Sequence, residues 1–324
     1  MNHLSPPQLT LPCGTGWDFG DVPYGVEPLL LPGPDSMVGP VRTDPRRYLE
    51  VCQQIERLAA GHDALDDLTR SAPDEVELAW FRWITGHQVS FVVWRVMAAL
   101  LRRRDEQPRT TAGLEQALRH CVRSYAAMLL YTGSCRRATY ESVIRSSMRL
   151  QHRSFSGSWA PDYVPVRSFL RGHHRARTTA AAPLDEAVVT LHLVHDAIAA
   201  KLVPDGRSLL HQANLPLTDT RLAHLLYDNY FLTVRSSVDA DQIVVQLLRR
   251  LVAIAQDVTV NGVHPPGWDE GAEAAVALVG GVAECEKHLL NITLGLATTV
   301  ARGGPDGLID ASDIDVESGI GARS

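Results

Sequence analysis

Residues 71–104 read SAPDEVELAWFRWITGHQVSFVVWRVMAALLRRR, and this stretch predicts one long central helix. Ser71 and Asp74, with Pro73 between them, are typical of a helix start. The three closing arginines are favoured where the helix dipole is negative. About thirty residues between these signals correspond to roughly 45 Å of helix, long enough to cross a whole domain.

One face of the predicted helix is aromatic. Five residues, spaced by three, four, four and three positions, share it: Trp80, Trp83, His87, Phe91 and Trp94. A histidine on such a face has two interpretations. It is a core residue bonded to the backbone or to Ser90, or it faces a cavity for a cofactor or substrate. In the second case the apolar wall would lower its pKa by desolvation.

Composition limits the class of protein. The chain has 324 residues, is 45% hydrophobic and carries a net charge of −6. A sizeable core is therefore expected, and nucleic acid is not expected as a partner, because phosphate binding needs a basic surface. The five cysteines form no Cys-x-x-Cys pair, which excludes a zinc knuckle, a dithiol redox site and Cys-x-x-Cys-His haem attachment. No signal peptide or membrane-spanning run is recognised, so a reduced, cytoplasmic protein with no membrane partner is expected.

The fold class predicted along the chain is all-α, a bundle of about eight helices. Residues 1–43, rich in proline and glycine, are predicted to form an extended arm on the body or on a neighbouring subunit, and a homo-oligomer, a dimer, is expected. Residues 44–302 are predicted to form one helical catalytic domain, and 303–324 a disordered acidic tail. No strand is predicted. Besides the central helix, helices are predicted over 44–69, 111–144, 143–150, 183–202, 222–234, 240–258 and 270–300.

A second histidine, His195, falls on the apolar stripe of the helix predicted over 183–202. It is either a core histidine or an axial ligand to haem iron, since such ligands commonly project from a helix into an apolar pocket. His224, His264 and His288 are the other histidines considered for that role.

Two arginines, Arg149 and Arg153, lie one helical turn apart beside a glycine-containing loop. They are either solvated side chains or a fork for a carboxylate, which the planar guanidinium binds with two hydrogen bonds. No Ser-His-Asp or Gly-x-Ser-x-Gly pattern supports ester hydrolysis.

The sequence GHQVSFVVWR at 86–95 resembles the distal-histidine helix of tryptophan 2,3-dioxygenases. In that family a His-Gln pair is followed by Tyr-Glu-Leu-Trp-Phe-Lys. His87-Gln88, an aromatic residue at Trp94 and a base at Arg95 are kept here, whereas Tyr-Glu is replaced. Downstream, LQHR at 150–153 is similar to the family's Phe-Gln-Ser-x-Gln-Phe-Arg, whose last arginine binds the substrate carboxylate.

The resemblance implies membership of the haem-dependent aromatic oxygenases. The glycine-serine-rich loop before the dioxygenases' proximal histidine is not recognisable, and the chain is most similar to the bacterial haem-dependent L-tyrosine 3-hydroxylases of antibiotic pathways. That similarity implies haem b as cofactor, L-tyrosine as substrate, hydrogen peroxide as oxidant and L-DOPA as product.

By the same resemblance His87 would be the distal acid–base group. The other implied roles are Trp83 and Phe91 at the cofactor, Arg153 and then Arg149 at the substrate carboxylate, and His195 on the iron. Two alternatives stay open: ring cleavage of an indole, as in the 2,3-dioxygenases, and a helical binding protein without a cofactor.

Overall fold

The computed structural model describes residues 4–12, 16–20, 22–36, 42–60, 74–106, 112–173, 183–203, 209, 217–263, 285 and 287–301. The tail predicted over 303–324 and the candidate His264 lie outside the described residues. Ser71, predicted as the cap of the central helix, also lies outside them.

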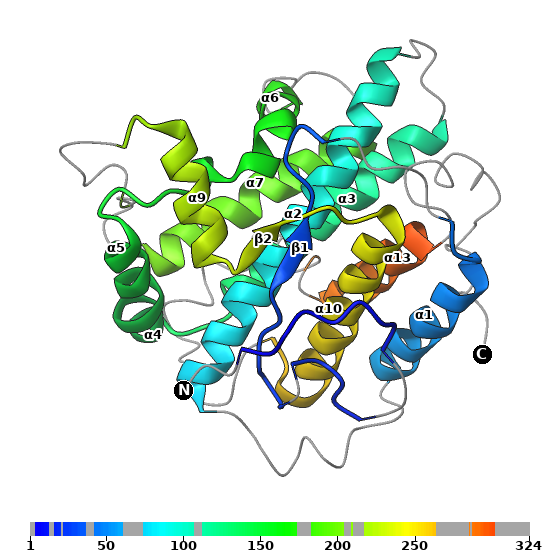
Figure 1. The fold of residues 1–324 in the computed structure, drawn as a ribbon, viewed down its shortest axis with the longest axis horizontal. Helices are drawn as coiled ribbons and strands as arrows, with labels where there is room; N and C mark the ends of the chain where they lie inside the picture. The colour runs from blue at the N-terminus through cyan, green and yellow to red at the C-terminus, as the bar shows by residue number, and fades with distance from the viewer. Residues whose placement is uncertain are drawn as a thin grey trace.

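The central helix is α2, Glu75–Glu106 (Figure 1). It begins after Asp74, whose carboxylate accepts the backbone N–H of Glu77 at 2.9 Å, so Asp74 caps the helix where Ser71 was predicted to do so. The helix is long and apolar enough to span a membrane, but 72% of its most apolar segment is buried inside the protein. Within the described chain it is the central core helix, against which several of the others pack directly.

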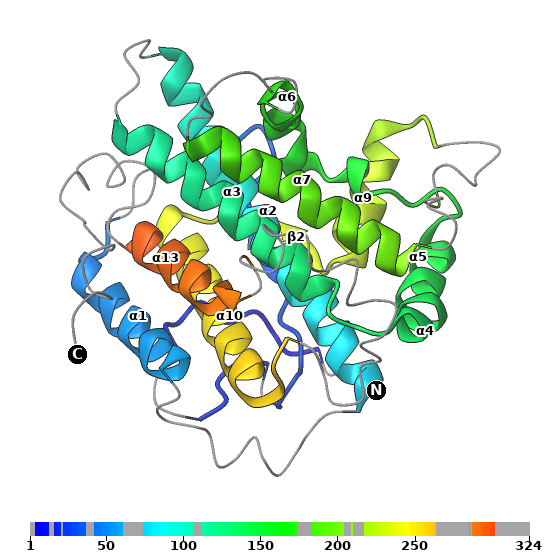
Figure 2. The same cartoon turned by 180° about the vertical axis from the view of Figure 1, so that it is seen from behind.

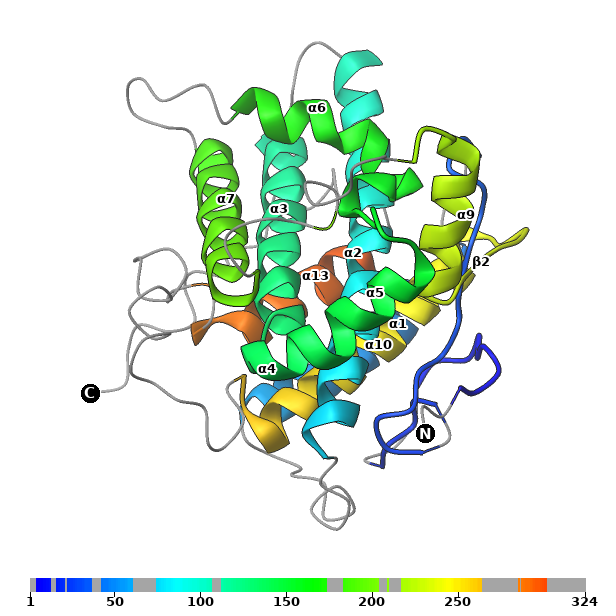
Figure 3. The same ribbon diagram turned by 90° about the vertical axis from the view of Figure 1, so that its left-hand side faces the viewer.

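Helix α3, Ala112–Thr132, packs along α2, and α7, Pro183–Leu202, packs on the other side of α3 (Figures 2 and 3). Gly86 permits the close approach of α2 and α3, since a Cβ there would lie 2.5 Å from Cγ2 of Thr132. The span predicted for α7 is confirmed.

A second group of helices covers another side of α2. Helix α10, Ala240–Asn261, packs against it, and α1, Pro45–Ala59, and α13, Leu289–Ala301, pack on α10 (Figure 2). Asp239 and Gln242 form a reciprocal capping box at the start of α10. This mostly helical architecture confirms the predicted all-α class.

The prediction of one helix from residue 111 to 144 is wrong. Helix α3 ends at Thr132, and Gly133 passes so close to α7 that a Cβ there would lie 2.6 Å from Cδ1 of Ile198. The chain continues as α4, Arg137–Thr139, a π-helical turn, Tyr140–Arg145, and α5, Ser146–Gln151. A π turn departs from the 3.6-residue repeat, so periodicity cannot predict it.

The loop predicted after residue 151 contains two short 3₁₀ turns, Gly157–Trp159 and Pro161–Tyr163, and leads into an unpredicted helix, α6, Val164–His173. Helix α9, Thr220–Tyr230, ends earlier than predicted. It is followed by a short strand, β2, Thr233–Arg235.

A strand pair connects the N-terminal arm to the body, although no strand was predicted. Strand β1, Leu29–Leu31, pairs in parallel with β2, with Leu29 opposite Thr233 (Figure 1). Three residues of β1 are too few to show an alternating pattern in the sequence. The pairing fixes the arm beside the end of α9.

Candidate functional site

His87 occupies the middle of α2, and its ring is held in one tautomer. Nδ1 lies 2.7 Å from the backbone carbonyl oxygen of Trp83. Because a carbonyl oxygen only accepts, Nδ1 carries the proton and Nε2 keeps its lone pair. Burial lowers the His87 pKa to about 4, although the bond to Trp83 opposes this shift. At neutral pH the side chain is therefore an uncharged imidazole with Nε2 able to accept a proton.

Aromatic rings enclose this imidazole. The Phe231 ring is stacked on it, with centroids 4.4 Å apart and planes 22° apart. Trp83 lies 4.3 Å away and Phe91 lies 6.4 Å away, centroid to centroid. We call the surrounding set of touching rings the aromatic cluster: Trp83, His87, Phe91, Tyr140, Phe155, Tyr227, Tyr230 and Phe231.

The ends of the predicted stripe extend the aromatic cluster in both directions. Trp80 meets the Tyr230 ring edge-on at 5.9 Å. Trp94 contacts Phe91 at 5.5 Å and Tyr163 at 4.9 Å. The five stripe residues thus lie on one side of α2, as their spacing predicted.

The tyrosines of the aromatic cluster are neutral. Burial raises the pKa of Tyr140, Tyr227 and Tyr230 above the ordinary value. The Tyr230 hydroxyl shares a 2.8 Å hydrogen bond with Ser147. The indole Nε1 of Trp83 is buried beside that hydroxyl, close enough to oppose the upward shift of the Tyr230 pKa. His87 is thus surrounded by uncharged rings, four of which carry polar hydrogens: Trp83, Tyr140, Tyr227 and Tyr230.

Gln88, the second residue of the His-Gln pair, faces away from the aromatic cluster and is fully buried. Its amide nitrogen donates to the carbonyl oxygens of Glu27 and Phe231, at 3.1 and 3.0 Å. Its amide oxygen accepts from Nε of Arg250 at 2.8 Å. This motif residue therefore connects α2 to the arm, to α10 and to the residue that covers His87.

Arg95, the base of the same motif, has a structural role. Its guanidinium donates to Asp162 at 3.0 Å and to the carbonyl oxygen of Gly33 at 3.2 Å. Arg235 binds the same carboxylate at 2.8 Å, and the Asp162 side chain is only 2% exposed. Arg95 thus joins α2 to the arm and to the loop before α6.

The two arginines predicted to bind a carboxylate, Arg149 and Arg153, are both exposed. The buried arginine of this segment is Arg145, 4% exposed, in the π-helical turn. It lies close enough to Tyr140 to oppose the upward shift of that tyrosine's pKa. Arg145 was not predicted at the site, because a buried arginine resembles its exposed neighbours in sequence.

The burial predicted for His195 is wrong. Its side chain is 64% exposed and pairs with Asp196 at 3.4 Å, whereas Leu191 and Val194 form the buried stripe of α7. Val188, Leu191 and Leu202 of the predicted stripe are buried, but Val194 is buried in place of His195, which lies on the solvent side. Such a position argues against an axial ligand in an apolar pocket.

Other histidines differ in their surroundings. His224 on α9 and His288 before α13 are half-buried. His120 on α3 faces Gly295 of α13. Burial and the positive charge of Arg123 lower the pKa of His120. Within the described ranges, no three His, Cys, Asp or Glu residues come together as a metal site.

One side of a haem site fits the residues present. A haem needs a flat apolar wall and a polar group able to exchange protons near the iron. The aromatic cluster provides such a wall, and His87 offers Nε2. Trp83 and Phe91, predicted at the cofactor, both lie beside His87. The described residues do not identify the axial ligand on the opposite side.

Fold and site together define an all-α protein with a neutral histidine inside an aromatic cluster. Residues 44–189 match the sequence model of the family described as SfmD 3-methyl-L-tyrosine peroxygenase. The match covers a little under half of the chain and includes His87, the π-helical turn and the loop before α6. It supports a relationship to a peroxygenase-like family. No curated protein matches the chain.

Proposed function

We propose that this chain is a haem-dependent peroxygenase that hydroxylates the ring of a tyrosine-type amino acid, ortho to the phenol. The observation that carries the proposal is the neutral His87 with Nε2 available, inside the aromatic cluster and inside the segment that matches a peroxygenase family. The family's description favours a ring-methylated tyrosine beside L-tyrosine itself. A role in biosynthesis of a secondary metabolite follows from such a substrate class.

The overall reaction consumes one peroxide for each ring. An aromatic C–H and hydrogen peroxide give a C–OH and water, so the peroxide supplies the oxygen atom and is reduced. Bound haem would supply the iron that activates the peroxide for this insertion. The protein residues supply the proton transfers, the orientation of the ring and the exclusion of water.

His87 is proposed as the proton carrier. Nε2 accepts the proton of the peroxide and returns it to the oxygen that leaves as water. The Trp83 carbonyl keeps Nδ1 protonated throughout, so that exchange takes place at Nε2 alone. General acid–base assistance of this kind contributes about 10²–10⁴-fold to a rate.

The substrate's two ends require different surroundings. A phenol ring packs against aromatic side chains, and rings of this kind favour tilted or edge-on contacts like those in the aromatic cluster. The carboxylate requires an arginine, and Arg153 and Arg149 remain the predicted partners. Arg145 is a third candidate, because it is the buried arginine on the aromatic side of this segment.

The test is chemical. Purified protein would be mixed with haemin, and then L-tyrosine or 3-methyl-L-tyrosine would be added with isotope-labelled hydrogen peroxide. The proposal predicts a Soret band and a catechol product one labelled oxygen heavier. Tryptophan with oxygen and reductant giving a product two oxygens heavier would instead indicate indole cleavage. A protein that stays colourless with haemin would indicate a binding protein without this cofactor.

A further inference from the structure

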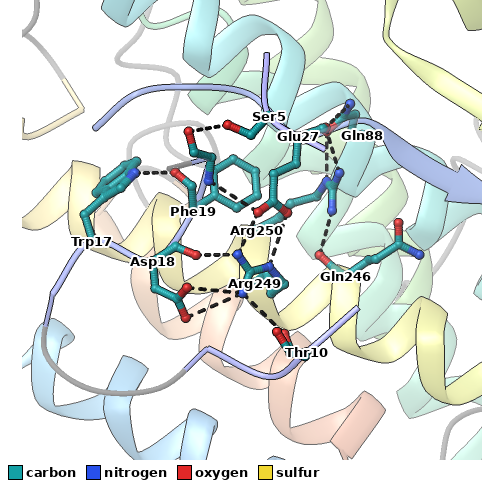
Figure 4. Close-up of polar contacts among 11 residues, drawn as sticks. Ser5, Thr10, Trp17, Asp18, Phe19, Glu27, Gln88, Gln246, Arg249 and Arg250 are labelled. Carbon is teal, nitrogen blue, oxygen red and sulfur yellow. Dashed lines mark hydrogen bonds and ion pairs between the residues drawn. The ribbon is translucent and has the colours of Figure 1, made fainter. Parts of the chain in front are cut away.

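The N-terminal arm is fastened to the body beside the aromatic cluster by buried charges (Figure 4). Arg249 of α10 donates to the Glu27 carboxylate at 2.6 Å and also meets Asp18 at 3.4 Å. Both Arg249 and Glu27 are about 1% exposed or less. Separating such a buried pair is costly, because one charge is left without its partner. The arm at Glu27 is therefore held firmly against α10.

Arg250, the next residue of α10, extends this attachment to α2. Its guanidinium donates to Gln88 at 2.8 Å and to the carbonyl oxygen of Glu27 at 3.0 Å (Figure 4). The ring of Phe19 lies 5.6 Å from its guanidinium carbon. Since Arg250 orients the amide oxygen of Gln88, the amide nitrogen points to the carbonyl oxygens of Glu27 and Phe231.

The backbone at Phe231 is held from a second side. Leu232 has φ 53°, a left-handed conformation that is uncommon for a leucine. Its carbonyl oxygen accepts the N–H of Leu29, at the start of β1, at 2.9 Å. A strained conformation persists only where neighbouring contacts impose it. Here those contacts come from Gln88 and from the arm.

We propose that Gln88 is a positioning residue: together with the arm at Glu27–Leu31 it holds Phe231 so that the Phe231 ring covers His87. Gln88 itself faces away from the imidazole and acts through Phe231. The inference explains why a fully buried polar residue follows His87, and it assigns the arm a part in shaping the site. It rests on the proposed function only for its effect on catalysis, since the geometry can be measured without substrate.

The groups that face His87 from the neighbouring elements are uncharged. Its pKa has two causes, burial and the Trp83 carbonyl, and no charged side chain is among them. The titratable groups of the described residues nearest to it are the tyrosines of the π-helical turn and α9: Tyr140, Tyr227 and Tyr230. Two cations lie behind residues that neighbour His87. Arg145 interacts with Tyr140, and Arg250 donates to Gln88.

The experiment uses the haem-free full-length chain with isotope-labelled histidine and follows the ring protons of His87 by NMR. In the parent protein the stacked Phe231 ring shifts these resonances, and His87 titrates near pH 4. The Phe231→Leu variant shows where the His87 resonances lie when no aromatic ring covers the imidazole. Gln88→Met is expected to move the His87 resonances toward those of Phe231→Leu and to raise the His87 pKa toward its ordinary value.

Gln256 offers a matched control. It is also 1% exposed and also holds the arm, but outside Glu27–Leu31, since its Nε2 donates to the carbonyl oxygen of Gly16 at 3.3 Å. Gln256→Met should lower the melting temperature but leave the His87 resonances in place. If Gln88→Met does not fold, Gln88→Glu keeps the bond to Arg250 and removes both donors, and its chemical shifts at one pH serve instead. Unchanged His87 resonances in the Gln88 variants, or equal changes in Gln256→Met, would overturn the proposal. Neither result depends on haem binding or turnover, so failure here is distinct from failure of the peroxygenase proposal.

Discussion

Nδ1 of His87 donates a 2.7 Å hydrogen bond to the carbonyl oxygen of Trp83, one turn earlier in the same helix. This single contact selects the tautomer, orients the ring and leaves Nε2 for chemistry. Phe231 then covers the ring from the side of α9. A helix that carries its own orienting acceptor four residues before the histidine needs no second residue for that purpose.

Removal of the imidazole tests its catalytic role. His87→Ala is expected to lower turnover of a tyrosine substrate by about 10²–10⁴-fold, because proton transfer at Nε2 is lost. Haem binding, followed by the Soret band, should persist. His192→Ala is a suitable control, since His192 also contacts a backbone carbonyl, that of Leu170, at 3.2 Å on α7. Full activity in His87→Ala would exclude this residue as the proton carrier.

The low pKa of His87 predicts how stability depends on pH. The folded value, about 4, lies below the ordinary value, so the unfolded chain binds more protons in between. Stability is therefore fully present above about pH 6.5 and falls as the pH drops toward 4. The expected loss between about pH 7 and pH 5 is about 2 kcal/mol from this residue. Urea unfolding of the parent and of His87→Gln at both pH values measures it. Equal pH dependence in the two proteins would contradict a buried neutral imidazole.

A buried ion pair connects α2 to α10. Arg82 donates to Asp257 through two nitrogens, at 2.7 and 3.1 Å, and both side chains are about 1% exposed or less. Asp257→Asn is expected to cost about 3–5 kcal/mol of unfolding free energy, because it leaves a buried guanidinium uncompensated. Glu141→Gln, which removes the exposed pair with Arg137, should change stability by less than about 1 kcal/mol. Comparable costs for the two variants in denaturant titrations would show that Arg82 is solvated.

Because His195 lies on the surface, its removal is expected to have little effect. His195→Ala should change the unfolding free energy by about 0.5 kcal/mol or less and leave the haem spectrum as in the parent. His224→Ala and His288→Ala, tested beside it, examine two half-buried histidines by the same spectrum. Loss of the Soret band in His195→Ala alone would restore it as the axial ligand and would require α7 to rearrange when haem binds.

The sequence predicted the helices whose apolar repeat is regular, and missed what depends on long-range contacts. The spacing of Trp83, His87 and Phe91 was enough to place them on one face of α2, since side chains three and four residues apart are neighbours on a helix. Phe231 could not be assigned to His87, because 144 positions separate the two residues in the chain.

Two features of the candidate site were not predicted from the sequence. Arg145, in the π turn Tyr140–Arg145, is buried, whereas Arg149 is exposed. On α7 the apolar residues Leu191 and Val194 form the buried repeat without His195. The polar imidazole of His195 is hydrated on the exposed side of the helix. Both choices are decided by packing that periodicity alone does not resolve.

The most direct test of the central claim is an absorption spectrum followed by product analysis. Protein supplied with haemin should show a Soret band that changes on addition of L-tyrosine or 3-methyl-L-tyrosine. With isotope-labelled hydrogen peroxide the substrate should then gain one labelled oxygen ortho to its phenol, and His87→Ala should not form that product at a comparable rate. A protein that binds haemin, responds to neither amino acid and transfers no label from peroxide would contradict the proposed function.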